Sequence, residues 1–334
     1  RKAHSQPASR DEAKNGGIMS DHQYVPILRG KQGEFKALEF LSSDVKARIR
    51  PLFELEAPTD PGKKTLEEHY KAFAQALVRH FGTEQEFFVE DDGAADSETV
   101  GGNHPLVALF SVLHAESLTP VPVTGLTRTA AYGAAINHVT AATQRLCIRL
   151  EADDFNDLAA LPALLNGILE ATSLGHAEVD LLVDFGGLPA NTGTMTLAIV
   201  AALSTLPNIH DWRSLTLAMT AFPEKPSAHV AAASTGRLPR AAWTIYQAVL
   251  ASSTPRKPDY GDYAVDNPET ELDIAPALLA NTMTATIRYS TDSDWLISRG
   301  RRLKTHGYEQ YRELSAGLMR EPEYKGASFS WGDQ

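Results

Sequence analysis

Charged side chains stand at one end of successive apolar segments of this chain. The first segment, residues 23–28, leads directly into Arg29, Gly30, Lys31 and, three residues later, Glu34. A glycine at such a turn lets the backbone reverse direction without a steric penalty and holds the charges together at the end of the segment. Side chains in this position either bind a ligand or lie solvated at a corner, and this stretch alone does not decide between the two.

The same arrangement recurs along the chain. The further residues at the ends of apolar segments are Glu54, Glu56, Glu90, Asp91, Asp92, Arg149, Glu151, Asp153, Asp184, Asp262, Arg288 and Tyr289. Arg149, Glu151 and Asp153 occupy alternate positions, so we expect them on one face of a strand. The amino ends of the segments contain apolar or neutral residues, which favours a functional site at the carboxyl ends.

These residue types suit a phosphorylated ligand. Carboxylates hold divalent cations through oxygen, while arginine and lysine neutralise phosphate oxygens. The residues expected to be catalytic are Glu54, Asp91 and Glu151. Those expected to bind phosphate are Arg29, Lys31, Arg149 and Arg288. Those expected to hold Mg²⁺ or Mn²⁺ are Glu54, Asp91, Glu151 and Asp184.

The sequence therefore predicts a metal-assisted phosphoesterase or related hydrolase that acts on a phosphorylated small molecule, such as a nucleotide, or on a nucleic-acid end. The alternative is structural, because barrel interiors also contain arginine and glutamate side chains that only satisfy one another.

The elements that would position these residues alternate between strand and helix. Strands are expected at 23–28, 51–56, 86–93, 119–125, 145–154, 178–187 and 214–222, and helices at 33–48, 64–81, 105–114, 130–143, 155–174, 192–206 and 238–250. The eighth strand is expected at 258–265, although 284–290 fits the closing strand equally well.

The strands are nearly continuous apolar runs, which is typical of a parallel sheet covered on both faces. No glycine-rich dinucleotide fingerprint follows any of them, so an open, doubly wound sheet is disfavoured. The sequence predicts an α/β fold with a single (β/α)8, TIM-barrel-like domain over residues 21–334 and an irregular C-terminal part.

Composition narrows the class of protein further. The 334 residues carry a net charge of −11, which argues against a general binder of nucleic acid or membrane surfaces but leaves room for a local basic pocket. The single cysteine, Cys147, excludes a disulfide framework. No membrane-length apolar run or signal peptide occurs, so we expect a cytoplasmic protein without a membrane partner. Residues 1–20 have no apolar periodicity and are expected to be a disordered linker, an upstream extension or a cloning remnant.

Several further residues are weaker candidates for a functional role. His104, His114 and His138 lack metal-ligand spacing and are expected to lie on the surface or to cap helices. Cys147 is expected in the core. The basic run 299–304 either contacts a phosphate backbone or is a solvated helix start.

A set of short motifs resembles a known family. The motifs are Tyr-x-Pro-x-Leu-Arg-Gly-Lys-x-x-Glu at 24–34, Pro-Leu-Phe-Glu at 51–54, Tyr-Gly-Asp-Tyr at 260–263, Trp-Leu-Ile at 295–297 followed by Gly300, and Phe-Ser-Trp-Gly-Asp at 329–333. In this order they resemble the phage "beta protein" family, which is found in phages, prophages and bacterial mobile elements.

The resemblance agrees with one barrel-like domain, supplies no catalytic residues, and implies that a C-terminal element follows Gln334. It also implies a phage-conflict setting. The second functional hypothesis is accordingly a non-catalytic binding component of a defence or counter-defence module, with another protein of that module as its partner.

Overall fold

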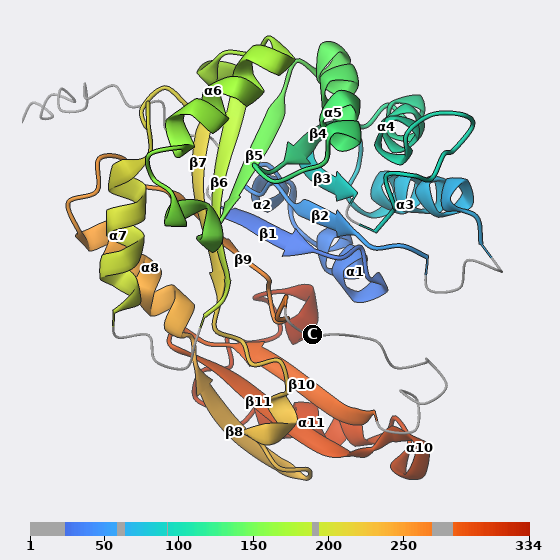
Figure 1. Ribbon diagram of the computed structural model, residues 1–334. Coiled ribbons are helices and arrows are strands. Elements are labelled where there is room, and N and C mark those ends of the chain that lie inside the picture. Colours follow the sequence, from blue (N-terminus) through green and yellow to red (C-terminus); the bar gives the residue numbers. More distant parts are fainter. Residues whose placement is uncertain (1–23, 59–63, 92, 189–193, 269–282) are drawn as a thin grey trace, which may run out of the picture.

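A closed barrel of eight parallel strands forms the body of the molecule (Figure 1). The computed structural model describes residues 24–58, 64–91, 93–188, 194–268 and 283–334. In barrel order the strands are β1 (Tyr24–Leu28), β2 (Leu52–Leu55), β3 (Glu86–Asp91), β4 (Thr119–Thr124), β5 (Leu146–Glu151), β6 (Val179–Gly187), β7 (Ser214–Thr220) and β9 (Asp259–Asp262). The expected (β/α)8 fold is confirmed.

The barrel closes through β9, which pairs in parallel with β7 on one side and with β1 on the other. The closing strand therefore lies within 258–265, and the alternative at 284–290 is wrong. Residues 1–20, for which a linker, extension or remnant was expected, lie outside the described residues, as do Gln23 and Asp92.

Helices follow the strands and surround the barrel (Figure 1). They are α1 (Gln32–Glu39), α2 (Ser43–Lys46), α3 (Leu66–His80), α4 (Pro105–Ala115), α5 (Ala130–Thr143), α6 (Leu161–Thr172), α7 (Met195–Thr205) and α8 (Ala241–Ala251). At α3 the start is fixed by Thr65 and Glu68, whose side chains each accept a hydrogen bond from the other's backbone N–H, at 3.2 and 2.9 Å. None of the helices in the described ranges combines the length and apolarity that a membrane span needs.

Two expected helices are shorter than the sequence suggested. The helix expected at 33–48 is split, because the chain is extended at Ser42 between α1 and α2. The helix expected at 155–174 begins only at Leu161. A 3-10 turn (Ala152–Asn156) precedes it, rich in short acidic side chains that bond to nearby backbone instead of continuing a helix.

The core has two layers. One lies between the strands and the surrounding helices, and the other fills the barrel interior. The interior layer consists of Val25, Ile27, Leu52, Phe88, Val121, Val123, Cys147, Leu182, Ala218 and Tyr263. Cys147 is buried there, as expected. The interior is therefore a packed plug that separates the two ends of the barrel.

A small antiparallel sheet lies beside the carboxyl ends of the barrel strands (Figure 1). Its strands are β8 (Ser234–Pro239), β10 (Thr284–Ser290) and β11 (Asp294–Arg302), and α10 (Leu303–His306) and α11 (Gln310–Leu318) follow them. The strand β8 comes after β7, and β10 and β11 come after β9, so the sheet is built from segments that leave the barrel mouth.

Aromatic contacts help to hold this small sheet and the C-terminal segment against the barrel. Phe222, which follows β7, meets Trp295 of β11 with the ring centroids 5.1 Å apart. The C-terminal segment returns toward the barrel, where Trp331 stacks on Phe40 at the end of α1 at 4.2 Å. The sheet is thereby held on the same side of the molecule as the carboxyl ends of the strands.

Candidate active site

Charged side chains enter the barrel just above its apolar plug. Glu54, Glu90, Arg149 and Asp184 each follow by two positions an interior residue of the same strand, respectively Leu52, Phe88, Cys147 and Leu182. Because side chains alternate along a strand, all four point inward at the carboxyl ends.

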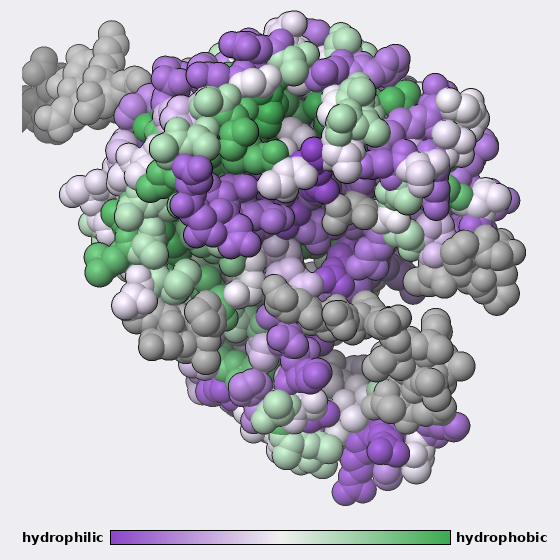
Figure 2. All heavy atoms as spheres, in the orientation of Figure 1, coloured by the Kyte–Doolittle hydropathy of each residue, from purple (hydrophilic) through white to green (hydrophobic). Residues whose placement is uncertain are grey.

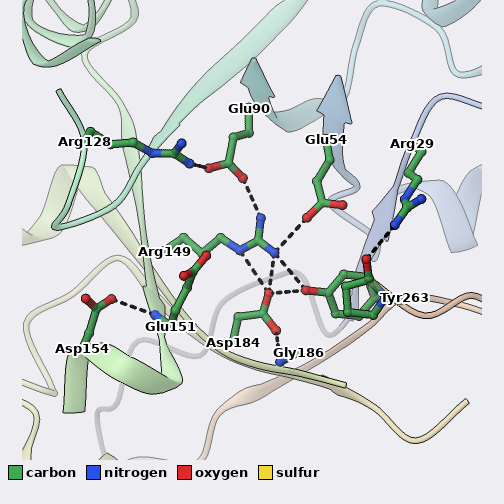
Figure 3. Close-up of polar contacts among 11 residues, drawn as sticks. Arg29, Glu54, Glu90, Arg128, Arg149, Glu151, Asp154, Asp184, Gly186 and Tyr263 are labelled. Carbon is green, nitrogen blue, oxygen red and sulfur yellow. Dashed lines mark hydrogen bonds and ion pairs between the residues drawn. The ribbon is translucent and has the colours of Figure 1, made fainter. Parts of the chain in front are cut away.

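Arg149 joins the carboxylates of this group (Figure 3). Its guanidinium donates to Asp184 at 3.0 and 2.6 Å, to Glu90 at 2.6 Å, and pairs with Glu54 at 2.8 Å. Arg128, from the loop after β4, binds the other oxygen of Glu90. We call Glu54, Glu90, Arg149 and Asp184 the mouth cluster.

The Arg149–Asp184 pair is held from two further directions. Tyr263 donates its hydroxyl to Asp184 at 2.6 Å and accepts from Arg149 at 2.9 Å, while the Gly186 amide donates to Asp184 at 2.8 Å. Burial opposes the charge on Arg149, but Asp184, Tyr263 and Glu54 together outweigh it, and the pKa of the guanidinium lies well above its ordinary value. Arg149 is a fixed cation that sets the orientation of the surrounding carboxylates.

Glu54 differs from the carboxylates around it. Burial raises the pKa of Glu54 above its ordinary value, although the neighbouring Arg149 lowers it in part. The side chain of Glu54 is nevertheless 19% exposed, against 2% for Asp184 and Glu90. A carboxyl group whose pKa is raised and which still meets solvent is suited to acid–base chemistry.

A cavity of about 220 Å³ opens over the cluster. Its polar lining includes Glu54, Glu90, Arg128, Arg149, Glu151 and Asp154. Glu151 is exposed, and its backbone N–H donates to Asp154 at 2.8 Å. Figure 2 shows hydrophilic side chains gathered in the hollow between the barrel and the small sheet. Carboxylates outnumber the two arginines in this cavity, so its interior is acidic.

The glycine turn after β1 forms the rim. Glu34 accepts from the backbone amides of Arg29 at 3.0 Å and of Lys31 at 2.8 Å. The Arg29 side chain pairs with Glu56 at 3.2 Å, and the Lys31 side chain binds Asp266 at 2.7 Å. The turn therefore presents two cations at the edge of the mouth, each beside an acid.

Three residues that were expected at the strand ends, Asp91, Arg288 and Asp153, lie apart from the mouth cluster and its cavity. Asp91 points to the helix side of β3, where it is buried and accepts a hydrogen bond from Tyr70 of α3. Arg288 lies on β10, donates to the Val265 carbonyl and covers the Phe222 ring at 4.9 Å. Asp153, expected to share a strand face with Arg149, lies in the 3-10 turn after β5.

The expected metal ligands do not form a coordination set. Glu54 and Asp184 come together, but the Arg149 guanidinium lies between them, and Asp91 faces away. In the ranges that the structure describes, no group of three or more histidine, cysteine, aspartate or glutamate side chains is arranged to hold a metal ion. The carboxylates are thus arranged around the guanidinium group of Arg149 and not around a site for Mg²⁺ or Mn²⁺.

The amino ends of the strands, expected to be apolar or neutral, carry a second ion-pair network. Asp180 pairs with Arg50 at 2.8 Å and with Arg213 at 2.9 Å, and both arginines also reach Glu86. The expectation is wrong because both arginines lie within two residues of a strand start and bind Asp180 from 33 and 130 residues away, which short sequence windows do not reveal. We call Arg50, Glu86, Asp180 and Arg213 the base cluster.

The sequence interpretation did not include Tyr263 and Arg128 among the site residues, and it favoured Asp91 over the neighbouring Glu90. Glu90 and Asp91 stood side by side at a strand end, and only the position of Phe88 in the plug shows that Glu90 is the inward one. Tyr263 belonged to the Tyr-Gly-Asp-Tyr motif and could have been found there. Arg128 lies in a loop without periodicity and gave no signal.

His104 caps a helix, one of the two roles expected for it. The ring Nδ1 of His104 accepts from the Leu106 amide at 3.2 Å and so caps the start of α4.

Comparison with known proteins identifies one family. The model of the Beta protein family matches residues 24–334. No curated protein and no solved structure matches the chain.

Proposed function

The chain belongs to the Beta protein family, and from the geometry of its barrel mouth we propose that it is a hydrolase acting on a nucleotide or a nucleic-acid end by general acid–base catalysis. Glu54 is the proposed acid and Glu151 the proposed base. Family membership supplies no activity, so the proposal depends on the mouth cluster.

One observation carries the proposal. Glu54 is the carboxyl group of the mouth cluster that combines a raised pKa with access to the cavity. Its position is fixed by Arg149, which in turn is fixed by Asp184 and Tyr263. An acid held in one orientation beside a cavity is what proton transfer to a leaving group requires.

The reaction follows from these placements. Hydrolysis breaks the bond to the leaving group, adds the hydroxyl of a water molecule to the substrate and a proton to the leaving group. Glu54 donates that proton, and the exposed carboxylate of Glu151 accepts the proton that the water loses. Exchange with solvent then restores both carboxyl groups. Because Arg149 occupies the space between the carboxylates, we assign no step to a metal ion.

Glu54→Gln tests the assignment, because the amide keeps the shape of the side chain and removes its titrating proton. Products from nucleotides and short oligonucleotides would be measured by chromatography. We expect the variant to lose about 10²–10⁴-fold in kcat. Glu116→Gln, on the surface at the end of α4, is the matched control and should retain the full rate. Absence of turnover across the panel, or full activity in Glu54→Gln, would refute the proposal.

A second candidate is a non-catalytic binding component of a phage-conflict module in the cytoplasm. It is favoured by the fact that Arg149 and its carboxylates satisfy one another, which a rigid platform needs as much as an enzyme does. Affinity capture from infected and uninfected cells would recover a protein of the module. Failure to recover one from either source would count against this candidate.

A further inference from the structure

The interior of the mouth is acidic and therefore does not favour binding of the phosphate of a nucleotide. Glu54, Glu90 and Asp184 already surround Arg149, and Glu151 and Asp154 add further negative charge to the cavity. A dianionic group beside these carboxylates would be repelled. If the substrate is phosphorylated, its phosphate must lie outside this cavity.

A second cavity lies beside the mouth, between the carboxyl ends of β1 and β2 and the helices α1 and α3. Its volume is about 410 Å³, within the range of small-molecule sites. We call it the α1–α3 groove and define it by its apolar floor of Phe35, Leu55 and Phe73 and its polar rim of Arg29, Glu56, Lys64 and His69. Its location is separate from that of the mouth cluster.

A glycine forms part of the groove lining. Gly30 has a φ of +69°, a conformation that other residues adopt with strain, whereas a Cβ at this position would make only an ordinary contact with the Phe73 ring at 3.5 Å. The turn, and not a lack of space in the groove, therefore requires this glycine. A flat apolar group would meet Phe35 and Phe73 there.

The rim of the groove carries excess positive charge. Arg29 is paired with Glu56, which balances one cation with one acid, and Lys64 adds a further positive charge. His69 lies next to Lys64, and burial together with this lysine lowers the pKa of the imidazole below its ordinary value. The rim thus carries a net positive charge, which favours binding of an anion. The mouth cavity does not carry such a charge.

Glu56 connects the groove to the mouth. It follows Glu54 by two positions, so the two side chains start about 7 Å apart along the chain. A ligand of nucleotide size that places its anionic end in the groove can therefore reach Glu54 with its other end.

We propose that the α1–α3 groove is a binding subsite for the phosphate-bearing end of a nucleotide, with the phosphate at Lys64 and Arg29 and an apolar face of the ligand against Phe35 and Phe73. The identity of the ligand as a substrate rests on the proposed hydrolase function, whereas binding to the groove does not. The bond cleaved at Glu54 then belongs to an uncharged part of the substrate.

Calorimetric titration of the whole chain with adenosine monophosphate, adenosine and inorganic phosphate tests the subsite. We expect the monophosphate to bind at least about tenfold more tightly than adenosine or phosphate alone, because only it has both parts. The same binding should persist in Glu54→Gln, so that loss of turnover and loss of the groove are distinguished. Equal affinity for adenosine and its monophosphate would overturn the assignment of phosphate to the rim.

Two substitutions locate the site. Lys64→Glu reverses the rim charge, and Ala72→Trp fills the groove from an exposed position of α3. Each should weaken binding of the monophosphate by about tenfold or more. Lys71→Glu and Gln75→Trp, on exposed positions of α3 that do not line the groove, are the controls and should bind as the parent does. Unchanged affinity in both groove variants would refute the proposal.

Discussion

The two ends of the barrel contain ion-pair networks of different design. In the base cluster, two arginines meet two carboxylates, so the charges balance. In the mouth cluster, Arg149 meets three carboxylates, and Arg128 adds a second cation at Glu90. The apolar plug separates the two clusters.

The comparison shows which property of a strand end indicates function. Charged residues gather at both ends of this barrel. Their presence at strand ends therefore does not distinguish a functional site from a structural ion-pair network. The mouth differs in its excess of acid, in the raised pKa of Glu54 and in the cavity above it. These are the features that active sites in barrels combine at the carboxyl ends.

The largest expected effect is that of Arg149→Met. The substitution leaves the buried Glu90 and Asp184 and the partly exposed Glu54 without their shared cation, and should lower the free energy of unfolding by about 3–5 kcal/mol. Urea denaturation would measure the loss. If the variant is as stable as the parent, the carboxylates of the mouth do not depend on Arg149, and the asymmetry between the two ends is of no energetic consequence.

The barrel itself could be predicted from sequence, because apolar runs alternating with helical periodicity leave few other folds. The small sheet could not. Its strand β8, Ser-Thr-Gly-Arg-Leu-Pro, is polar and contains glycine and proline, so residues 238–239 were instead expected to start a helix. The strand β10 was recognised as extended, but its partners β8 and β11 decide its sheet.

The candidate site could be predicted only in part, because strand ends are visible in the sequence but the interior face of a strand is not. Glu54, Arg149 and Asp184 were expected at the mouth and are found there, because a strand end is a local property. The choice between Glu90 and Asp91 depended on which face of β3 is interior. An all-apolar strand does not reveal its interior face, since both of its faces are buried.

Arg50→Met should have the next largest effect, about 3 kcal/mol. The substitution removes charged hydrogen bonds, but Arg213 remains bound to both Asp180 and Glu86. The Nε of Arg50 is buried without a partner, and its removal offsets part of the loss. A loss as large as that of Arg149→Met, measured by the same denaturation, would mean that charge balance does not distinguish the two ends.

Tyr263→Phe should cost less, about 1.5 kcal/mol, because it removes only the hydroxyl that bridges Arg149 and Asp184. Tyr246→Phe is the matched control, since the hydroxyl of Tyr246 donates to the neutral carbonyl of Pro258 at 3.0 Å. The control should lose less stability than Tyr263→Phe. Equal losses would show that the charged partners of Tyr263 add nothing.

The smallest expected effect is a difference in pH dependence between Glu86 and Glu54. Burial works against the charge of Glu86, but the hydrogen bond from Arg213 and the charges of Arg213, Arg50 and Arg145 together outweigh it, so the folded-state pKa of Glu86 is lowered. Its contribution to stability is present above the unfolded pKa of about 4.3 and is lost as the pH falls through the folded value. For Glu54, burial raises the folded-state pKa, so its contribution is present below about 4.3 and is lost as the pH rises through the folded value.

The two carboxylates should therefore give opposite slopes when each is replaced by glutamine. The stability difference between the parent and Glu86→Gln should shrink toward acid pH, and that between the parent and Glu54→Gln should shrink toward neutral pH. Urea denaturation at a series of pH values from acid to neutral would measure both. Slopes of the same sign would show that Glu54 is stabilised as a carboxylate just as Glu86 is. A carboxylate of that kind would not hold the proton that the proposed mechanism requires of Glu54. Slopes of opposite sign would show that Glu54 at the mouth is stabilised in its protonated form and Glu86 at the base as an ion-paired carboxylate.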